Sequence, residues 1–168
     1  MRILALLPLF AACAGTATVD QGLLPPVDTA TTDVAQSCGY SAANDLDPSP
    51  SVVEIDLAAS AMAWDPGTGI SLADGLAYDG TVPGPLIEAN VGDTVKVHFA
   101  NDTDEPLTVH WHGLRIDSAM DGGMQMDNPI EPGDTFDYEF IPPDAGFYWY
   151  HPHMDGATTL EQIGRAHV

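Results

Sequence analysis

Residues 95–100 decide the fold class, and they read Val95-Lys96-Val97-His98-Phe99-Ala100. The larger apolar side chains alternate with the others, as on a strand that buries one face, because successive side chains of a strand point to opposite sides of the sheet. The alternation recurs at residues 136–141, which read Phe-Asp-Tyr-Glu-Phe-Ile. His98 falls on the outward side of its predicted strand, so we expect it at the surface and do not predict it as a metal ligand.

Further strands are predicted on both sides of this stretch, at residues 52–57, 86–87, 107–112 and 147–151. Turn signals rich in proline, glycine, asparagine and aspartate separate them. In residues 131–134, Glu-Pro-Gly-Asp, the proline suits the second position and the glycine the third position of a type II turn. Short strands at near-regular spacing, without a long helical period, predict an all-β domain folded as a Greek-key β-sandwich or barrel.

Two histidine pairs lie near the ends of predicted strands, His110-Trp111-His112 and His151-Pro152-His153. Residues i and i+2 of a strand project from the same face, roughly 7 Å apart along the strand. Each pair therefore offers two imidazoles on one surface, and pairs on neighbouring strands can bring four together. Neutral histidine is the commonest metal ligand and suits copper and zinc. Because the pairs hold four of the six histidines, a metal site is favoured over scattered surface or core histidines.

The two pairs belong to an ordered series of short motifs. The series comprises residues 80–93, Gly-Thr-Val-Pro-Gly-Pro-Leu-Ile-Glu-Ala-Asn-Val-Gly-Asp, followed by His110-Trp111-His112-Gly113-Leu114, Met120-Asp121-Gly122, Asn128-Pro129-Ile130-Glu131-Pro132-Gly133 and Ala145-Gly146-Phe147-Tyr148-Trp149-Tyr150-His151-Pro152-His153. This order resembles the N-terminal cupredoxin-type domain of the multicopper oxidases, the laccase-like enzymes. The resemblance runs from about Val52 to Gln162 and implies a cupredoxin-like domain over residues 51–162. Phe147 departs from the family, which usually has threonine there.

The resemblance implies copper as the cofactor, held in a trinuclear cluster that reduces O₂ to water. Carried over by motif, His110 would bind the type 2 copper, His112 and His151 would share one type 3 copper, and His153 would bind the other. The remaining four histidines would come from a C-terminal cupredoxin domain of the same protein, which is the partner that the resemblance implies.

Asp121 matches an acidic position that lies near the cluster in the family. This match implies that it orients ligands or water and supplies protons during O₂ reduction; a plain turn residue of an Asp-Gly pair is the alternative. We expect Trp111, Trp149 and Tyr150 to pack the sheet and exclude water from the site. The methionines of this region are expected to fill gaps or loops rather than bind Cu(I); they are Met120, Met124, Met126 and Met154.

No cysteine follows the pattern of a blue-copper site, which needs a thiolate beside two imidazoles. Alone, the chain would therefore supply only half of the copper ligands that the resemblance implies and would be inactive as an oxidase. Two other interpretations stay open at this point. One is a stand-alone copper-binding or copper-buffering lipoprotein. The other is a relative of two-domain copper nitrite reductase, which the motifs around the histidines favour less.

The N-terminal third has a different composition from the rest. Residues 1–13 combine one arginine with a short apolar run, which predicts an export signal and a periplasmic or cell-surface protein. Phe10-Ala11-Ala12-Cys13 is similar to a bacterial lipoprotein cleavage box, so we predict a lipid anchor on Cys13, with plain secretory cleavage as the alternative. Residues 14–50 are predicted to be a flexible tether. Cys38 within it would be a free thiol or pair elsewhere.

The charge of the chain is strongly acidic, with 25 acidic and 4 basic residues and a formal net charge of −21. Such a chain is not expected to bind nucleic acid or an anionic membrane surface, so the membrane would be reached only through the lipid anchor. The acidic surface is more typical of a soluble exported protein than of a cation store.

The end of the sequence does not match the family. Relatives continue into a final strand, whereas residues 163–168 read Ile-Gly-Arg-Ala-His-Val. We expect this hexapeptide to be a sequence artefact, the final strand to be missing and one sheet edge to stay unpaired. His167 is therefore left out of the predicted ligand set.

Overall fold

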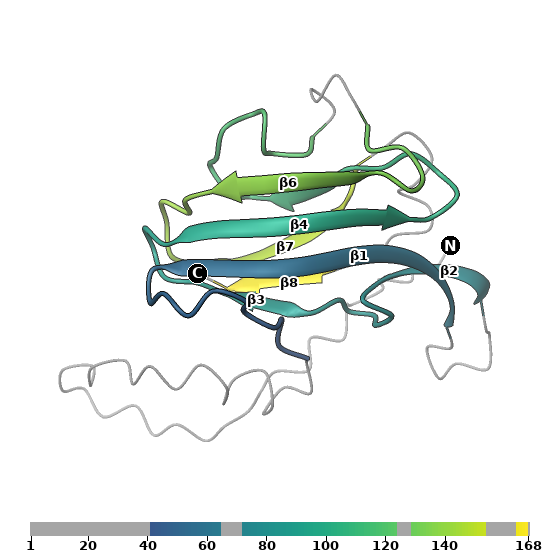
Figure 1. The fold of residues 1–168 in the computed structure, drawn as a ribbon, viewed down its shortest axis with the longest axis horizontal. Coiled ribbons are helices and arrows are strands. Elements are labelled where there is room, and N and C mark those ends of the chain that lie inside the picture. Colours follow the sequence, from purple (N-terminus) through teal and green to yellow (C-terminus); the bar gives the residue numbers. More distant parts are fainter. Residues whose placement is uncertain (1–40, 65–71, 124–128, 154–163, 168) are drawn as a thin grey trace, which may run out of the picture.

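The computed structural model describes residues 41–64, 72–123, 129–153 and 164–167, and for residues 64, 72–74 and 164–167 it describes the backbone alone (Figure 1). These residues form eight strands and no helix, so none of them forms an apolar helix of bilayer-spanning length. The strands are β1 (Val52–Trp64), β2 (Leu72–Tyr78), β3 (Leu86–Glu88), β4 (Thr94–Asp102), β5 (Val109–His112), β6 (Thr135–Phe140), β7 (Phe147–Pro152) and β8 (Gly164–His167).

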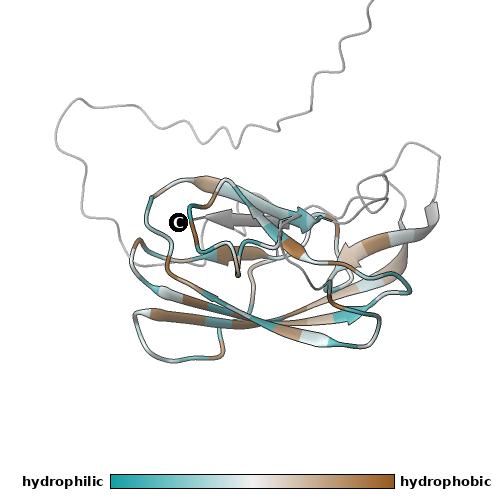
Figure 2. Cartoon of the chain, turned by 90° about the horizontal axis from the view of Figure 1, so that it is seen from above, coloured by the Kyte–Doolittle hydropathy of each residue, from teal (hydrophilic) through white to brown (hydrophobic). Residues whose placement is uncertain are grey.

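The strands form two sheets that pack face to face, which Figure 2 shows from above as two layers. One sheet has the order β2-β1-β4-β6 and the other has the order β3-β8-β7-β5. Within each sheet one pair is parallel, β1 with β4 and β3 with β8, whereas the remaining pairs are antiparallel. Parallel neighbours require a crossover connection, so the chain passes from one sheet to the other between them. The predicted β-sandwich is confirmed.

The core lies between the sheets and is built from the inward side chains of both. Ile55 and Leu57 of β1 stand beside Val97 and Phe99 of β4 in register, and all four are buried. Aromatic rings add to this packing: Phe99 and Tyr138 lie edge to face at 6.4 Å between ring centroids. The alternation predicted for residues 95–100 is therefore confirmed, with the larger apolar side chains of β4 facing the core.

The predicted strands all occur, but β2 and β8 were not predicted. Residues 72–78 read Leu-Ala-Asp-Gly-Leu-Ala-Tyr, which lacks alternation and contains a glycine, so the sequence carries little strand signal there. The final strand was expected to be missing, with one sheet edge left unpaired, and residues 164–167 were not expected to form a strand. Instead their backbone forms β8 between β3 and β7, because ladder hydrogen bonds need no particular side chain.

The turn between residues 131 and 134 has the predicted geometry. Gly133 has φ of +84°, the left-handed value that the third residue of a type II turn requires. The Asp134 N–H donates to the Glu131 carbonyl at 2.9 Å and closes the turn. The type II prediction is therefore confirmed.

The last ten residues of the predicted tether are part of the domain, and this corrects its boundary. The Leu86 N–H donates to the Ser41 carbonyl, and the Ala43 N–H donates to the Leu86 carbonyl, each at 2.8 Å. Asp45 Oδ1 accepts the N–H of Glu54 at 3.0 Å. Backbone hydrogen bonds hold this segment against the domain, and such bonds leave no apolar pattern in the sequence that could predict them. The rest of the tether, the export signal, Cys13 and Cys38 lie outside the described residues.

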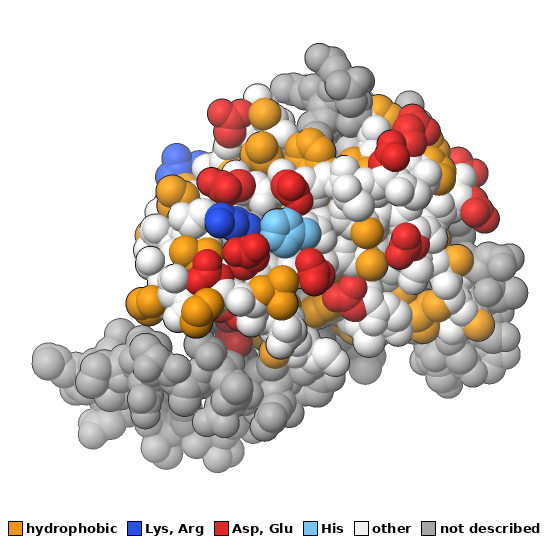
Figure 3. Space-filling model, viewed as in Figure 1, with side chains coloured by type: hydrophobic (Ala, Val, Ile, Leu, Met, Phe, Trp, Pro, Cys, Tyr) orange, Lys and Arg blue, Asp and Glu red, His pale blue; other side chains and the backbone are white. Residues whose placement is uncertain are grey.

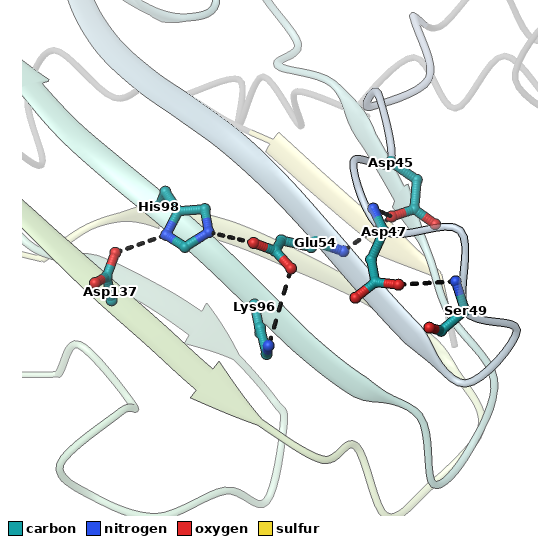
Figure 4. A network of polar contacts seen from close by, with 7 residues as sticks. All are labelled: Asp45, Asp47, Ser49, Glu54, Lys96, His98 and Asp137. Carbon is teal, nitrogen blue, oxygen red and sulfur yellow. Dashed lines mark hydrogen bonds and ion pairs between the residues drawn. The ribbon is translucent and has the colours of Figure 1, made fainter.

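A polar clasp crosses the outer face of the sheet β2-β1-β4-β6, where acidic side chains gather (Figure 3). His98 on β4 lies between Asp137 on β6, 2.7 Å from its Nδ1, and Glu54 on β1, 2.8 Å from its Nε2 (Figure 4). Lys96 also reaches Glu54 at 3.9 Å. Hydrogen bonds to Asp137 and then Glu54 raise the pKa of His98 above 6.5. His98 is thus the outward histidine that was predicted.

We predict that this clasp makes the stability of the domain depend on pH. A raised folded pKa adds stability that is fully present below the unfolded pKa and is lost as pH rises through the folded pKa. The contribution is below about 1 kcal/mol, because the groups are partly exposed. His98→Gln should therefore lower the free energy of unfolding by urea more at about pH 6 than at about pH 9.

Lys96→Gln is the matched control, because it removes a neighbouring cation that contacts the same Glu54 carboxylate and leaves His98 in place. Its loss of stability should be the same at both pH values, measured at one ionic strength. Equal losses at both pH values for His98→Gln would contradict the prediction.

Candidate metal centre

The two histidine pairs meet on the outer face of the sheet β3-β8-β7-β5. Val109 and Trp111 of β5 are buried in the core, so His110 and His112 project from the opposite face. His110 stands directly opposite His151 of β7 in the ladder. His153 follows directly after the end of β7, and its ring packs beside those of His110 and His151.

The imidazole of His110 is the centre of the group. Its ring centroid lies 5.4 Å from that of His112, 5.3 Å from that of His151 and 5.1 Å from that of His153. One nitrogen each of His110, His112 and His151 lies within 4.8 Å of the others. The predicted convergence of four imidazoles is therefore seen, and three of them bring donor atoms close enough to surround a metal ion.

Backbone carbonyls fix which nitrogen of two rings faces the centre. His110 Nδ1 lies 2.8 Å from the Asp121 carbonyl, and His151 Nδ1 lies 2.8 Å from the Pro152 carbonyl. A carbonyl oxygen only accepts, so both Nδ1 atoms must carry the proton. Each neutral ring then keeps a bare Nε2 for a metal, and a carbonyl partner of this kind is typical of metal-binding histidines.

His112 and His151 form the closest pair of ring nitrogens. His112 Nδ1 lies 3.3 Å from His151 Nε2, across the β5–β7 ladder. Without metal, His112 can donate a hydrogen bond to the bare nitrogen of His151. Because metal–imidazole bonds are about 2 Å long, both nitrogens can also reach one ion that replaces the shared proton.

Burial favours the neutral, metal-binding form of His151. His151 is buried, His110 and His153 are half-buried, and His112 is exposed. Burial lowers the pKa of His151 below 6.5, and the nearby rings of His110, His112 and His153 lower it further, against the opposing effect of the Pro152 carbonyl. A neutral imidazole near neutral pH is the state that coordination requires.

The segment of residues 121–123 rests directly on β5. The Asp121 carbonyl accepts the N–H of Trp111 at 3.2 Å in addition to His110 Nδ1, and the Thr108 hydroxyl donates to the Gly122 carbonyl at 2.5 Å. Gly122 has φ of +66°, and a Cβ there would overlap the Val109 carbonyl oxygen. Only glycine fits this position, so Gly122 lets the Asp121 carbonyl reach His110.

Asp121 also approaches the centre with its side chain. Its Oδ2 lies 3.3 Å from His110 Nδ1, and both side chains are largely shielded from solvent, with 18% of His110 and 32% of Asp121 exposed. Asp121 therefore lies beside the group of histidines. The sequence motif pointed to the carboxylate of Asp121. The structure adds the roles of the Asp121 backbone carbonyl, of Thr108 and of Gly122. The Asp-Gly pair was the only sign of these roles in the sequence.

The three aromatic residues that were expected to pack around the site lie in two places, the core and the histidine face. Trp111 and Tyr150 are buried in the core as predicted, and the Tyr150 hydroxyl donates to the Pro85 carbonyl at 2.8 Å. Trp149 lies instead on the histidine face, stacked on two imidazoles. Met120 packs against the core as a gap-filling residue. The other methionines named above lie outside the described residues.

Comparison with known sequences gives one family. A family model described as multicopper oxidase matches residues 63–166, more than half of the chain. Multicopper oxidase MmcO of Mycobacterium tuberculosis is 36% identical over 146 residues, which are 86% of this chain and 26% of that protein. Laccase-1 of Cryptococcus neoformans is 47% identical over 79 residues, which are 45% of this chain and 13% of that protein.

Solved structures give the same result. A multi-copper oxidase from Pseudomonas thermotolerans superposes with a TM-score of 0.64 at 34% identity, over 71% of this chain and 30% of that one. A metallo-oxidase from Campylobacter jejuni gives a TM-score of 0.67 at 26% identity, over 76% and 28%. The fold is therefore cupredoxin-like as expected. The chain spans about a quarter of the length of MmcO.

We predict that Gly122→Ala disturbs the centre as well as the fold. The added methyl group cannot share space with the Val109 carbonyl, so residues 121–123 must move and the Asp121 carbonyl must leave His110. The free energy of unfolding should fall by about 3 kcal/mol, and the dissociation constant for Cu(II), measured by calorimetry, should rise about tenfold.

Gly80→Ala is the matched control, because Gly80 has nearly the same φ, +65°, with no atom within 4 Å of the place that the added methyl group would take. It should cost about 1 kcal/mol from backbone strain alone and leave Cu(II) binding unchanged. Equal Cu(II) affinity in the Gly122 variant and the wild type would show that the Asp121 carbonyl does not orient His110.

Proposed function

Because this chain belongs to the multicopper oxidase family, we propose that it is the N-terminal domain of an exported multicopper oxidase. In this proposal it supplies half of the histidine ligands of a trinuclear copper cluster that reduces O₂ to water. The observation that carries the proposal is the convergence of three histidine nitrogens within 4.8 Å on a face outside the core.

The residues present fit copper. Imidazole nitrogen suits copper, carbonyls that bind the Nδ1 atoms of His110 and His151 leave the Nε2 atoms as donors, and His151 resists protonation. Copper, when bound, would carry the electrons that reduce O₂. The described residues include no cysteine, so this part of the chain offers no thiolate for a blue-copper site.

The geometry supports an assignment of each histidine. His112 and His151 would share one type 3 copper, because their facing nitrogens are 3.3 Å apart. His110 would bind the type 2 copper through Nε2, since its Nδ1 is engaged by Asp121. His153, whose ring lies 5.1 Å from His110 and 5.8 Å from His151, would bind the second type 3 copper.

Asp121 would hold and deliver protons beside the cluster. Its carboxylate contacts His110 Nδ1 at 3.3 Å and is partly exposed to solvent. It can therefore exchange protons with water while it stabilises the protonated Nδ1 of His110. This position supports a role in moving protons toward the centre during O₂ reduction.

The partner that we propose is a C-terminal cupredoxin domain of the same protein. It would cover the histidine face, bring the other four histidines and complete the O₂ site. The imidazole of His112, a ligand candidate that is exposed to solvent, supports this face as the domain interface.

We further propose that the protein is exported to the periplasm or cell surface, with Cys13 as a lipid anchor and the only link to the membrane. Its net charge of −21 argues against nucleic acid as a partner. Replacing Cys13 by serine should move the protein from the membrane fraction to the soluble fraction. A wild type that is already fully soluble would contradict the lipid anchor.

The test of the metal centre is Cu(II) binding by the chain itself. Calorimetry should detect binding that weakens as pH falls through the histidine range, because protonated imidazole cannot coordinate. The complex should lack intense blue absorption, and phenol oxidation should be undetectable. His110→Ala combined with His153→Ala should weaken binding at least about 100-fold, whereas His98→Ala should leave it unchanged.

Two results would change the proposal. Retained copper binding in the double variant, with loss in His98→Ala, would reject the ligand assignment. If the protein binds copper but its full gene encodes no downstream His-Cys-His and no further His-X-His pairs, a copper-buffering lipoprotein would be favoured over an oxidase.

A further inference from the structure

Trp149 lies against two of the imidazoles that face each other. Its ring centroid is 4.4 Å from that of His112 and 4.2 Å from that of His151, and each pair of planes is inclined by 25°. The sheet explains both contacts. Trp149 is the cross-strand partner of His112 in the ladder, and it shares one face of β7 with His151 two residues later.

Both imidazoles lie on the same face of the indole. The centroids of His112 and His151 are 5.5 Å apart. Rings stacked on opposite faces of one indole would be separated by about twice the stacking distance, roughly 7 Å. The shorter separation places the imidazoles side by side on that face, with their planes inclined by 43° to each other and with His112 Nδ1 and His151 Nε2 3.3 Å apart.

The orientation of His112 depends on stacking against Trp149 more than the orientations of the other imidazoles do. The nitrogens of His110 and His151 that face away from the centre are held by backbone carbonyls. Among the described residues, no carbonyl or carboxylate forms a hydrogen bond with His112, which is exposed and whose ring contacts are with His110, His151 and Trp149. Stacking on the indole therefore does for His112 what a hydrogen bond does for its neighbours.

We propose that Trp149 is a positioning residue for copper, a flat platform that holds His112 and His151 side by side so that both can bind the same ion. This inference rests on the proposed function of the histidine centre. It predicts that an aromatic ring at position 149 is required for metal affinity and geometry, although residue 149 supplies no ligand atom.

The experiment compares Trp149→Leu, Trp149→Phe and the wild type, each as the full chain, titrated with Cu(II). Trp149→Leu keeps an apolar side chain but removes the platform. It should raise the dissociation constant about tenfold and change the electron paramagnetic resonance spectrum of the bound Cu(II). Trp149→Phe should restore most of the affinity and the wild-type spectrum, because a phenyl ring still stacks.

A measurement without copper reports the platform itself. In the metal-free wild type, the ring protons of His112 and His151 should be shifted upfield in the NMR spectrum by the indole ring current, and this shift should vanish in Trp149→Leu. Tyr148→Leu is the matched control, because Tyr148 directly precedes Trp149 on β7 and packs against the core. It should leave the imidazole shifts and Cu(II) affinity unchanged.

The outcomes separate this inference from the proposed function. A wild type that binds no Cu(II) through the histidines overturns the proposed function and the inference with it. A Trp149→Leu chain that binds Cu(II) with wild-type affinity and spectrum overturns the inference alone. If Trp149→Leu does not fold, a Trp149→Phe chain that folds but lacks both the wild-type spectrum and the upfield shifts also overturns it.

Discussion

The packing of Trp111 in the core fixes which face of β5 carries the histidines. Its indole contacts the rings of Tyr138, Phe140 and Tyr150 at centroid distances of 5.5, 5.0 and 5.5 Å. A strand has a side-chain period of two, so a slip of one residue would expose this indole and bury the imidazoles on either side of it. The aromatic anchor thus makes any other register of β5 costly, and the whole metal centre depends on that register.

Around this fixed strand, the imidazoles are oriented by two different kinds of contact. Carbonyl groups of Asp121 and Pro152 set the tautomers of His110 and His151, which is a directional, polar constraint. The ring of Trp149 limits rotation of His112 by packing. The carbonyl of Asp121 reaches its place only because Gly122 lies flat against β5. Main-chain geometry therefore orients the centre together with the histidine side chains.

Much of this arrangement could be predicted from the sequence, because it follows from period-two patterns and turn chemistry. Alternation located β4 and β6, the spacing of His110 and His112 placed both on one face, and Gly133 marked its turn. Backbone pairing that leaves no side-chain pattern could not be predicted, which is why β2, β8 and residues 41–50 were missed. The stacking of Trp149 also requires knowledge of which residue lies across the ladder, and a single sequence does not contain that register.

None of the four histidines belongs to the buried apolar cluster between the sheets. The apolar core therefore needs no histidine ligand for its packing, in contrast to small zinc domains that are unfolded without their ion. Under the proposed function, metal uptake would be an equilibrium separate from folding. Bound ion would then add stability that grows with the logarithm of the ion concentration relative to the dissociation constant. Such a domain can lose its ion and regain it without unfolding, so its occupancy can follow the supply of metal.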